Sequence, residues 1–509
     1  WNANAALYYT RSFNKHNLNL SVAWEASSGS SDATNVHYRG FPSGQFHSSN
    51  YAAEIYEKPS RTEGTSRMVS AWATGNYTWN DIYLADFSVR FDGSSDFGSK
   101  QRWAPFFSGG LGVNIHNYEF LKGNEIVNKL KVRASYGRTG KASFPAYAAT
   151  TMYEALFDEW YATGFGAVLK ALGNNNLTWE KTDKFNVGIE MQFLNRRLTV
   201  DADYYHDKTI DLVNDVSLSQ TSGFSSYKDN MGEVLNQGFE LQVRGEVFRN
   251  RDWLVALWGN MAHNKNKILK ISDSQRAYNQ RVKEFYENIV NEEYGRYNSK
   301  YGVPISQYEE GQSLTSIWAV KSLGIDPTTG KEIFLNRDGS VSDTWNATQE
   351  VAVGNTEPKF NGSIGFNAAY KQWSLFAAFQ YEWGGQEYNQ TLVDRVENAR
   401  IQYQNVDLRV LTDRWKQPGD IAQFKDIKNA DSATMPTSRF VQDKAYLRLS
   451  ALTLSYDFNR EWIKKYLGMN MLRLEASTRD FINWNSIRQE RGLSYPKSWT
   501  VDFSIKAQF

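Results

Sequence analysis

The 509-residue sequence contains no cysteine and little proline. The absence of cysteine excludes a disulfide scaffold, a thiolate zinc site and a cysteine nucleophile, and it leaves the compartment open. The 10 prolines are well below the average usage of about 5%. Because proline cannot donate to a sheet ladder, this low content suits a chain made mostly of strands.

Charge imbalance and long apolar runs are missing as well. The 57 Lys and Arg residues against 56 Asp and Glu leave a net charge of +1, so the charge gives no reason to expect nucleic acid as a partner. The longest local apolar run, Trp253 to Gly259, falls far short of the roughly 18 residues of a membrane-spanning helix. A helical membrane protein is therefore excluded.

The sequence starts without methionine or an apolar leader, and we expect a mature or partial chain.

Aromatic residues, by contrast, are abundant, and apolar residues alternate with polar ones. The 17 Trp, 29 Tyr and 29 Phe argue against disorder. Phe185, Val187 and Ile189 fall on one side of a strand and Asn186 and Glu190 on the other, which is the two-residue period of β structure. The same period recurs along the chain and predicts fifteen strands, at residues 1–12, 16–27, 65–77, 81–92, 103–116, 128–138, 184–193, 198–213, 238–248, 253–268, 358–370, 373–384, 446–458, 471–484 and 498–509.

The lengths of these strands and of their connectors indicate a membrane barrel. The strands average about 13 residues, whereas strands of globular proteins have about 5 to 6 and membrane-spanning strands about 9 to 11 plus their rims. Connectors after odd-numbered strands have 2 to 12 residues, and those after even-numbered strands have 10 to 89. Short periplasmic turns and long extracellular loops are typical of outer-membrane barrels. The sequence therefore predicts an all-β fold, a transmembrane antiparallel β-barrel with its apolar side toward lipid.

The number of strands predicts that the barrel is incomplete. Bacterial single-chain barrels have an even number of strands, and fifteen is odd, so we expect at least one further strand on the N-terminal side. Residues 1–509 would then be the C-terminal part of the barrel. Ser316 to Gly324 also looks strand-like, and an additional hairpin there would give seventeen strands without changing the parity.

Seven short motifs in a fixed order resemble one family. They are FDGSSDFG at 91–98 followed by Arg102-Trp103, LKVRASYGRTG at 130–140, NLTWEKT at 176–182, NMGE at 230–233 with NQGFE at 236–240, GIDPTTG at 324–330, YLRL at 446–449 with LTLSY at 452–456, and the terminal strand ending at Phe509. Through nearly its whole length the chain resembles the barrel of a SusC/RagA-type TonB-dependent transporter from the outer membrane of Bacteroidota. It departs from that pattern at Asn174-Asn175, where the family often has proline, and after Asp457, where Leu-Pro is common.

The resemblance implies a barrel of 22 strands, of which this chain would supply 15 to 17. It also implies a plug domain, a TonB box and a signal peptide, none of which is in this sequence. Such a protein would be an active importer of oligosaccharides or oligopeptides. It would be a multi-pass β-barrel of the cell outer membrane, surrounded by outer-membrane lipid, and its partners would be a SusD-like surface lipoprotein and, through the missing N-terminal part, TonB. The resemblance implies no enzyme activity and no cofactor.

Aromatic residues in the long connectors are the candidate substrate-binding residues. Trp160 and Tyr161 lie in one connector, and Trp383 and Tyr388 lie around the start of another. Each could stack on a sugar ring or pack on a peptide side chain, although aromatic residues at barrel rims more often form the interfacial girdle or pack loops. Phe509, which ends an alternating strand, resembles the signal by which barrel proteins are recognised for assembly.

Other polar patterns predict no chemistry. Asp201 and Asp203 share one side of a strand, where a solvated barrel wall explains them better than paired catalytic carboxylates. Residues 336–343 lack the closing Glu of a calcium loop, and the six histidines show no ligand spacing. We therefore expect no catalytic residue and no metal site. A passive porin-like channel and a soluble all-β carbohydrate-binding or hydrolytic protein are the alternatives.

Overall fold

The computed structural model describes residues 1–45, 48–97, 102–141, 149–171, 173–174, 177–217, 226–230, 232–291, 302–402, 405–429, 434–458, 460–488 and 499–509. These residues form two compact units. Unit 1 contains 1–111, 135–184 and 209–231, and unit 2 contains 112–134, 185–208 and 232–509.

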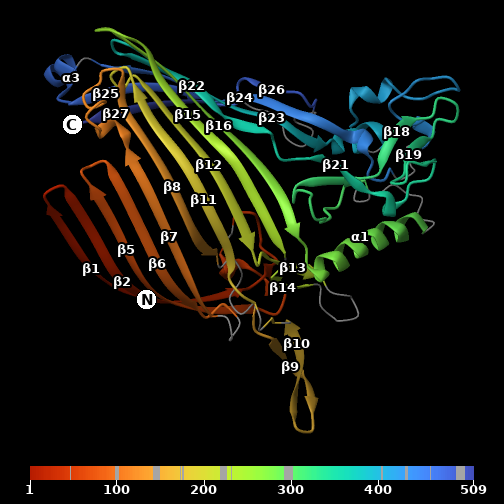
Figure 1. Cartoon of the computed structure of the whole chain (residues 1–509). Helices are drawn as coiled ribbons and strands as arrows, with labels where there is room; N and C mark the ends of the chain where they lie inside the picture. Colours follow the sequence, from red (N-terminus) through yellow and green to blue (C-terminus); the bar gives the residue numbers. More distant parts are fainter. Residues whose placement is uncertain are drawn as a thin grey trace. The chain divides into compact units, whose positions relative to one another are not determined.

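Most strands belong to one long sheet, drawn as neighbouring arrows in Figure 1. Its order is β1 (Asn2–Phe13), β2 (His16–Asn35), β5 (Ser60–Trp79), β6 (Tyr83–Ser94), β7 (Trp103–Asn114), β8 (Val127–Lys141), β11 (Glu180–Phe193), β12 (Leu198–Ile210), β15 (Glu233–Arg249), β16 (Trp253–Lys270), β22 (Phe360–Tyr370), β23 (Trp373–Tyr388), β24 (Val441–Asp457), β25 (Met471–Thr478) and β27 (Val501–Gln508). The short strand β26 (Asn483–Asn485) pairs with β24. The registers described along this path are antiparallel.

Each of the fifteen predicted ranges overlaps one strand of this path, but several ends differ. β2 continues to Asn35 and β5 already begins at Ser60, and the two remain paired residue by residue over this polar extension. Backbone hydrogen bonds hold the extension, so no apolar alternation marks it in the sequence. The predicted strand 471–484 is instead β25 and β26, because Asp480 between them has a left-handed φ of 56°, which interrupts an extended strand.

The remaining elements lie mainly in the long connectors. The small strands are β3 (Tyr38–Arg39), β4 (Glu54–Ile55), β9 (Met152–Tyr161), β10 (Gly164–Ala171), β13 (Val213–Ser217), β14 (Ser226–Asn230), β17 (Ser316–Ala319), β18 (Lys321–Ile325), β19 (Glu332–Leu335), β20 (Val341–Ser342) and β21 (Val351–Asn355). The helices are α1 (Asp273–Asn291), α2 (Gln390–Leu392) and α3 (Arg460–Leu467), with short 3-10 or π turns η1 (Ser49–Tyr51), η2 (Ile115–Asn117), η4 (Ala347–Gln349), η5 (Val393–Glu397), η6 (Leu408–Leu411), η7 (Ile427–Asn429) and η8 (Ser438–Phe440). None of the helices in the described ranges is both long and apolar enough to cross a membrane.

The strand-like stretch Ser316 to Gly324 does form strands, but they pair outside the long sheet. β17 pairs with β21, and β18 pairs with β19 in a separate three-stranded sheet. The additional hairpin that would have given seventeen wall strands is therefore not found at this stretch. The alternation of connector lengths is observed, since short connectors such as 14–15 and 371–372 alternate with long ones such as 271–359 and 389–440.

The two sides of the sheet differ in chemistry, as unit 2 shows. On its polar side, the Glu190 carboxylate accepts from Lys129 Nζ at 2.5 Å and Lys131 Nζ at 3.1 Å. The Arg133 guanidinium donates to Asp203 at 2.6 Å on the same side. Asp203 is thus an ion-pair partner in the wall, in line with the interpretation of this residue from the sequence.

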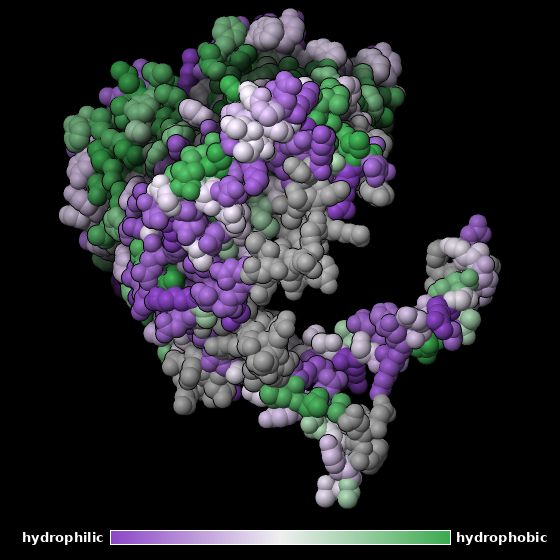
Figure 2. All heavy atoms as spheres, turned by 90° about the vertical axis from the view of Figure 1, so that its right-hand side faces the viewer, coloured by the Kyte–Doolittle hydropathy of each residue, from purple (hydrophilic) through white to green (hydrophobic). Residues whose placement is uncertain are grey.

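The opposite side of the sheet carries large exposed apolar residues. In unit 2 they include Leu257 (51% exposed), Ile364 (47%), Leu454 (43%), Phe503 (81%) and Ile505 (72%). Soluble proteins rarely leave contiguous apolar surface of this kind in water, whereas lipid-facing strands require it. In Figure 2, hydrophobic residues (green) gather along the upper and upper-left margin, and hydrophilic residues (purple) gather below them.

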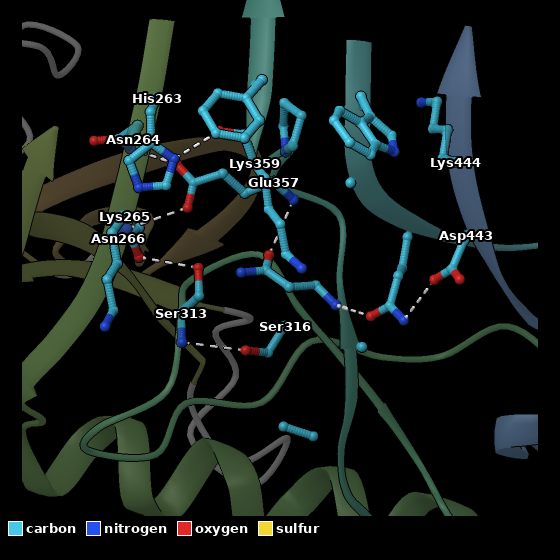
Figure 3. A pocket seen from close by; sticks show the side chains of 18 of the residues that line it. His263, Asn264, Lys265, Asn266, Ser313, Ser316, Glu357, Lys359, Asp443 and Lys444 are labelled. Carbon is cyan, nitrogen blue, oxygen red and sulfur yellow. Dashed lines mark hydrogen bonds between the residues drawn. The ribbon is translucent and has the colours of Figure 1, made fainter. Parts of the chain in front are cut away.

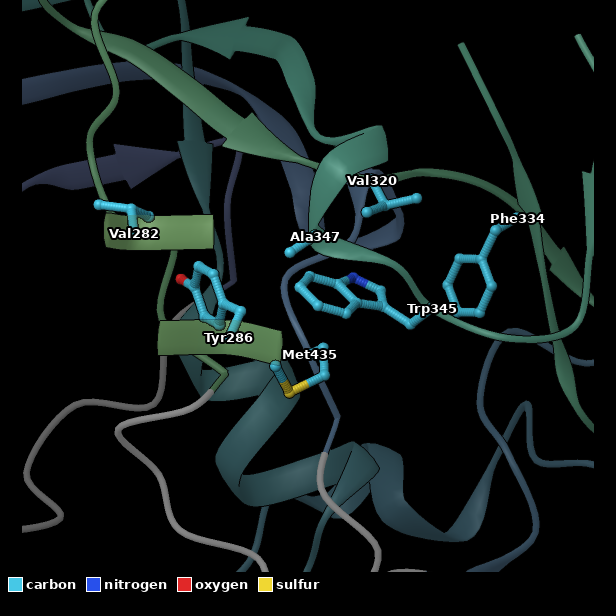
Figure 4. Packing of buried hydrophobic residues seen from close by; sticks show 7 residues of the cluster. All are labelled: Val282, Tyr286, Val320, Phe334, Trp345, Ala347 and Met435. Carbon is cyan, nitrogen blue, oxygen red and sulfur yellow. The ribbon is translucent and has the colours of Figure 1, made fainter. Parts of the chain in front are cut away.

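The two longest connectors of unit 2, residues 271–359 and 389–440, pack together around a core of their own, and we call them the loop body. α1 begins with a capping box, in which Gln275 N donates to Ser272 Oγ and Ser272 N donates to Gln275 Oε1. This helix brings Tyr286, fully buried, against Trp345 and Met435 (Figure 4). A second cluster surrounds Phe440, which is also fully buried.

Candidate functional site

A cavity of about 970 Å³ lies in unit 2 where the wall strands meet the loop body, and we call it the rim cavity (Figure 3). It is lined by His263–Asn266 of β16, Gly311–Ser313, Ser316, Ala352–Asn355, Glu357–Phe360, Trp383, Gly384 and Gln386 of β23, Asp443–Ala445 of β24, and Ser486. Cavities of this size that combine apolar walls with a few fixed polar groups are typical ligand sites.

One side of the rim cavity is built around Glu357. Its carboxylate accepts a hydrogen bond from Asn264 Nδ2 and another from the Asn266 backbone N, the latter at 3.1 Å. Asn266 in turn accepts from Leu314 N at 2.8 Å and Ser313 Oγ at 3.3 Å. These bonds fix the end of β16 to the loop body, so the polar groups are held in place before any ligand arrives.

The other side of the rim cavity is connected through Gln386. Gln386 Nε2 donates to Asp443 Oδ1 at 3.1 Å, and Gln386 Oε1 accepts from Asn355 N at 3.2 Å. Lys444 forms an ion pair with Glu387 at 3.2 Å. The rim cavity therefore offers amides, carboxylates and ammonium groups, which suit hydrogen bonding to a polar ligand.

A bulge in β23 shapes the mouth of the rim cavity. The register with β24 shifts between Trp383 and Gly385, and Gly384 has a φ of +81°, a conformation that glycine adopts without strain. Trp383 is 66% exposed and its ring lies 6.3 Å from that of Phe360. The bulge thus presents an aromatic surface beside the polar groups.

A second cavity, of about 600 Å³, lies in unit 1 on the polar side of its strands. Arg90 pairs there with Asp92 at 2.7 Å, and Trp179 is almost fully buried beside them. Phe97 stacks on Trp179 with ring centroids 4.1 Å apart, and Trp179 Nε1 donates to the Arg102 carbonyl at 3.3 Å. Two of the seven sequence motifs therefore meet in a packing contact.

The loop body contains several buried ionisable groups. The Arg439 guanidinium pairs with Glu332 at 2.9 Å and with the fully buried Glu397 at 2.7 Å. Burial lowers the pKa of the nearby Lys425 ammonium to about 8. Burial also raises the pKa of the Glu350 carboxyl, which accepts from Gln307 Nε2, to about 8. The described residues of the loop body thus form a folded structure with internal ion pairs and hydrogen bonds.

The residues selected from the sequence as substrate-binding candidates lie in different surroundings. Trp160 pairs through its backbone with Phe165 in the β9–β10 hairpin, its side chain lying outside the described residues, and Tyr161 is 68% exposed. Trp383 lines the rim cavity. Tyr388 packs edge-on against Phe440, with centroids 5.9 Å apart. Contact of these four residues with a substrate stays a prediction.

The proposed assembly signal, Phe509, is 79% exposed directly after β27, and its role also stays a prediction. The sequence interpretation missed Glu357, Asn266, Gln386 and Asp443, because isolated polar residues at strand ends look like ordinary solvated positions. The run His263 to Asn266, in which asparagine follows the apolar alternation of β16, was the available signal. Within the described ranges, groups of three or more His, Asp or Glu that could hold a metal ion are not found.

Fold and sequence together define the class. Residues 2–477 match the family described as TonB dependent receptor-like, beta-barrel, and the chain belongs to this family. The predictions of a transmembrane antiparallel β-barrel and of a SusC/RagA-type resemblance are therefore confirmed. The family consists of receptors and transporters of the outer membrane rather than enzymes, as the sequence predicted.

Individual relatives can be named. TonB-dependent receptor P3 of Formosa agariphila is 26% identical over 486 residues, covering 94% of this chain and 47% of the relative. TonB-dependent receptor SusC of Bacteroides thetaiotaomicron is 31% identical over 296 residues, covering 53% of this chain and 28% of the relative. The RagAB peptide importer in its closed-closed state matches with a TM-score of 0.81 at 23% identity, covering 100% of this chain and 55% of that chain, which shows likeness of fold. The chain spans about half the length of the first curated relatives it matches.

Proposed function

We propose that residues 1–509 form the C-terminal part of the barrel of an active, TonB-dependent importer in the cell outer membrane. It would carry oligosaccharides or oligopeptides and work with a SusD-like surface lipoprotein. The observation that carries the proposal is the membership of a long antiparallel wall, with its structured loop body, in the TonB-dependent receptor family. A soluble all-β protein does not fit this membership.

The parts of the chain would divide the work of transport. The wall strands keep their backbone groups paired within the sheet, which lipid requires, and present ion pairs such as Glu190 with Lys129 on the polar side. The rim cavity would hold the ligand through Glu357, Gln386 and the aromatic surface of Trp383. TonB would act on the plug, outside this chain. No bond of the substrate is made or broken in this scheme.

Energy coupling separates this proposal from a passive porin. Uptake of labelled oligosaccharides and oligopeptides is measured in cells that carry the full-length gene, in its deletion strain, and in a strain without functional TonB. The proposal expects uptake to be lost in both the deletion strain and the TonB-deficient strain. Uptake that persists without TonB but is lost on deletion of the gene would establish the porin-like alternative.

The partner and the substrate are tested together by affinity purification of the full-length protein from a detergent extract. A co-purifying surface lipoprotein at a constant molar ratio supports the proposed pairing, and recovery of the transporter alone under several mild detergents contradicts it. Mass spectrometry of the bound small molecules then separates a glycan from a peptide. An untagged strain serves as the control for non-specific recovery.

A further inference from the structure

The helix α3 lies in the connector between β24 and β25, residues 458–470, at the same end of the strands as the short connectors. Gly468, with a φ of +66°, follows its last residue, Leu467, and this left-handed glycine ends the helix. Ile463 is almost fully buried, whereas Trp462 is 48% exposed and Tyr466 is 63% exposed. One face of the helix is thus packed against the protein and an adjacent aromatic face is open.

The open aromatic face continues the apolar side of the sheet. Tyr456 lies opposite Trp373 in the register of β23 and β24, with ring centroids 4.8 Å apart. Phe458 contacts Tyr456 at 5.0 Å and Trp462 at 6.1 Å, and Trp462 lies 5.8 Å from Tyr466. The neighbouring Arg473–Asp457 ion pair, by contrast, belongs to the alternate positions of these strands and hence to the polar side. An unbroken row of rings therefore runs from the lipid-facing wall onto the helix.

Further aromatic residues mark the level of the membrane boundary at this end of the sheet. Trp253 and Tyr370, beside the short connectors 250–252 and 371–372, contact each other at 4.4 Å. They are 42% and 38% exposed. Rings at strand ends on the lipid-facing side form the girdle that lies at the height of the lipid headgroups. α3 follows shortly after Tyr456, the aromatic residue at the same end of β24 that contacts Trp373.

Positive charge lies on the remaining face of the helix. At 100° per residue, Trp462, Ile463, Tyr466 and Leu467 share one half of α3. Lys464 and Lys465 fall on the other half with Glu461 between them, so these three side chains leave one net positive charge. Both lysines are exposed, and Lys465 Nζ lies 5.3 Å from the Tyr466 ring. A helix with aromatic residues on one face and lysines on the other is the pattern of segments that lie in the plane of a membrane surface.

We propose that α3 is an interfacial helix that binds anionic phospholipid in the leaflet next to the short connectors. Trp462 and Tyr466 enter the boundary between headgroups and acyl chains, and Lys464 and Lys465 contact the lipid phosphates. The occupant follows from the continuity of α3 with the lipid-facing wall and from the charge of the two lysines. The inference rests on the membrane fold and not on the transported substrate, so it can fail or hold independently of the transport proposal.

The test uses the full-length protein in vesicles of phosphatidylcholine with 10% phosphatidylglycerol. Brominated acyl chains are placed either on the phosphatidylglycerol or on an equal amount of phosphatidylcholine, and tryptophan quenching is recorded. The quenching of Trp462 is obtained by subtracting the quenching measured for Trp462→Phe from that of the unmodified protein, separately for each lipid mixture. Brominated phosphatidylglycerol is expected to quench this signal more than brominated phosphatidylcholine. Each lysine should contribute about fivefold to the local enrichment of the anionic lipid.

The decisive variant is Lys464→Gln/Lys465→Gln, in which the preference for phosphatidylglycerol should disappear. The matched control is Lys416→Gln/Lys428→Gln, which removes the same charge from exposed residues of the loop body and should keep the preference. Heat-modifiable gel mobility confirms that each variant is folded. Equal quenching by both lipids in the unmodified protein, a preference retained without Lys464 and Lys465, or an equal loss in the control would overturn the proposal, as would a Trp462 that neither lipid quenches.

Discussion

Two regions of unit 2, the wall strands and the loop body, bury apolar residues in opposite ways. In the wall, Ile364 and Leu454 remain 47% and 43% exposed to the surroundings of the chain. In the loop body, the exposed fraction of Tyr286, Trp318 and Phe440 is at most 1%. The wall is completed by lipid, whereas the loop body has an interior like that of a water-soluble protein. The apolar residues of one chain are therefore suited to lipid in the wall and to a protein interior in the loop body.

The two regions also use charge differently. The Arg473–Asp457 pair of the wall is more than a third exposed on both side chains, but Arg439 and Glu397 of the loop body are 10% and 0% exposed. Exposed pairs contribute about 0 to 1 kcal/mol, while removal of one partner from a buried pair costs about 3 to 5 kcal/mol. The comparison thus predicts that charge substitutions in the two regions have unequal effects.

The largest effect is expected for Arg439→Met. This change leaves the Glu397 carboxylate buried without the guanidinium that pairs with it, and should destabilise the loop body by about 3 to 5 kcal/mol. Limited proteolysis should show faster cleavage between residues 271 and 440 while the wall keeps its heat-modifiable mobility. Arg473→Met is the matched control and should change stability by no more than about 1 kcal/mol; similar effects of both variants would contradict the comparison.

A somewhat smaller effect is expected for Val187→Arg in the wall. Val187 lies on the apolar side of β11, and a cation near the bilayer midplane costs about 2 to 4 kcal/mol. The neighbouring Asn186 accepts from Arg133 on the polar side, so Asn186→Arg should be tolerated better. Folding in detergent or lipid is followed by heat-modifiable gel mobility. Equal losses from both substitutions would show that the two sides have been assigned wrongly.

The loop body should respond to pH through Glu350. Burial raises the pKa of its carboxyl to about 8, so the folded state keeps a proton that the unfolded chain, with an ordinary pKa near 4, releases. The contribution is fully present below about pH 4 and is lost as the pH rises to about 8, with about 2 kcal/mol lost between pH 6 and pH 8. Proteolysis rates of the loop body at these two pH values measure the change. Glu350→Gln should remove the dependence, and a dependence that survives it must come from another group.

The smallest change in stability is expected for Trp383→Ala. Its ring is 66% exposed and pairs across strands with Phe360, so the loss should stay within about 1 kcal/mol. If Trp383 contacts the ligand, as the sequence predicts, binding weakens by about tenfold, which is about 1.4 kcal/mol. Ligand titration of the purified full-length protein measures this. Trp253→Ala, at the other end of the wall, is the control and should leave ligand binding unchanged.

The wall could be predicted from sequence because each strand carries its own two-residue period. Phe185, Val187 and Ile189 mark their strand without reference to any other part of the chain. The polar ends of β2 and β5 were missed, because their pairing depends on backbone groups. The loop body could not be predicted, because Tyr286 and Trp345 of one connector pack against Met435 of another, and β22 and β23 lie between the two connectors in the sequence.

The candidate site was predicted only in part, for a related reason. An aromatic residue in a long connector can be recognised in a sequence, and Trp383 does line the rim cavity. Whether such a residue is buried or exposed cannot be recognised in the sequence. Tyr388, only five residues after Trp383, packs against Phe440 instead. Glu357 is positioned in the rim cavity by hydrogen bonds from Asn264 and Asn266 of β16, which are distant in the sequence.

The polar extension of β2 and β5 has a practical consequence. From Ser27 to Asn35 the hairpin is held to residues 60–68 by main-chain pairing, which any residue except proline can provide. Substitutions in this stretch, including loss of the exposed Arg61–Asp32 pair, should therefore leave the main-chain pairing of the two strands intact. A single side chain in this stretch should therefore be replaceable by one that carries a fluorescent label without separating the two strands.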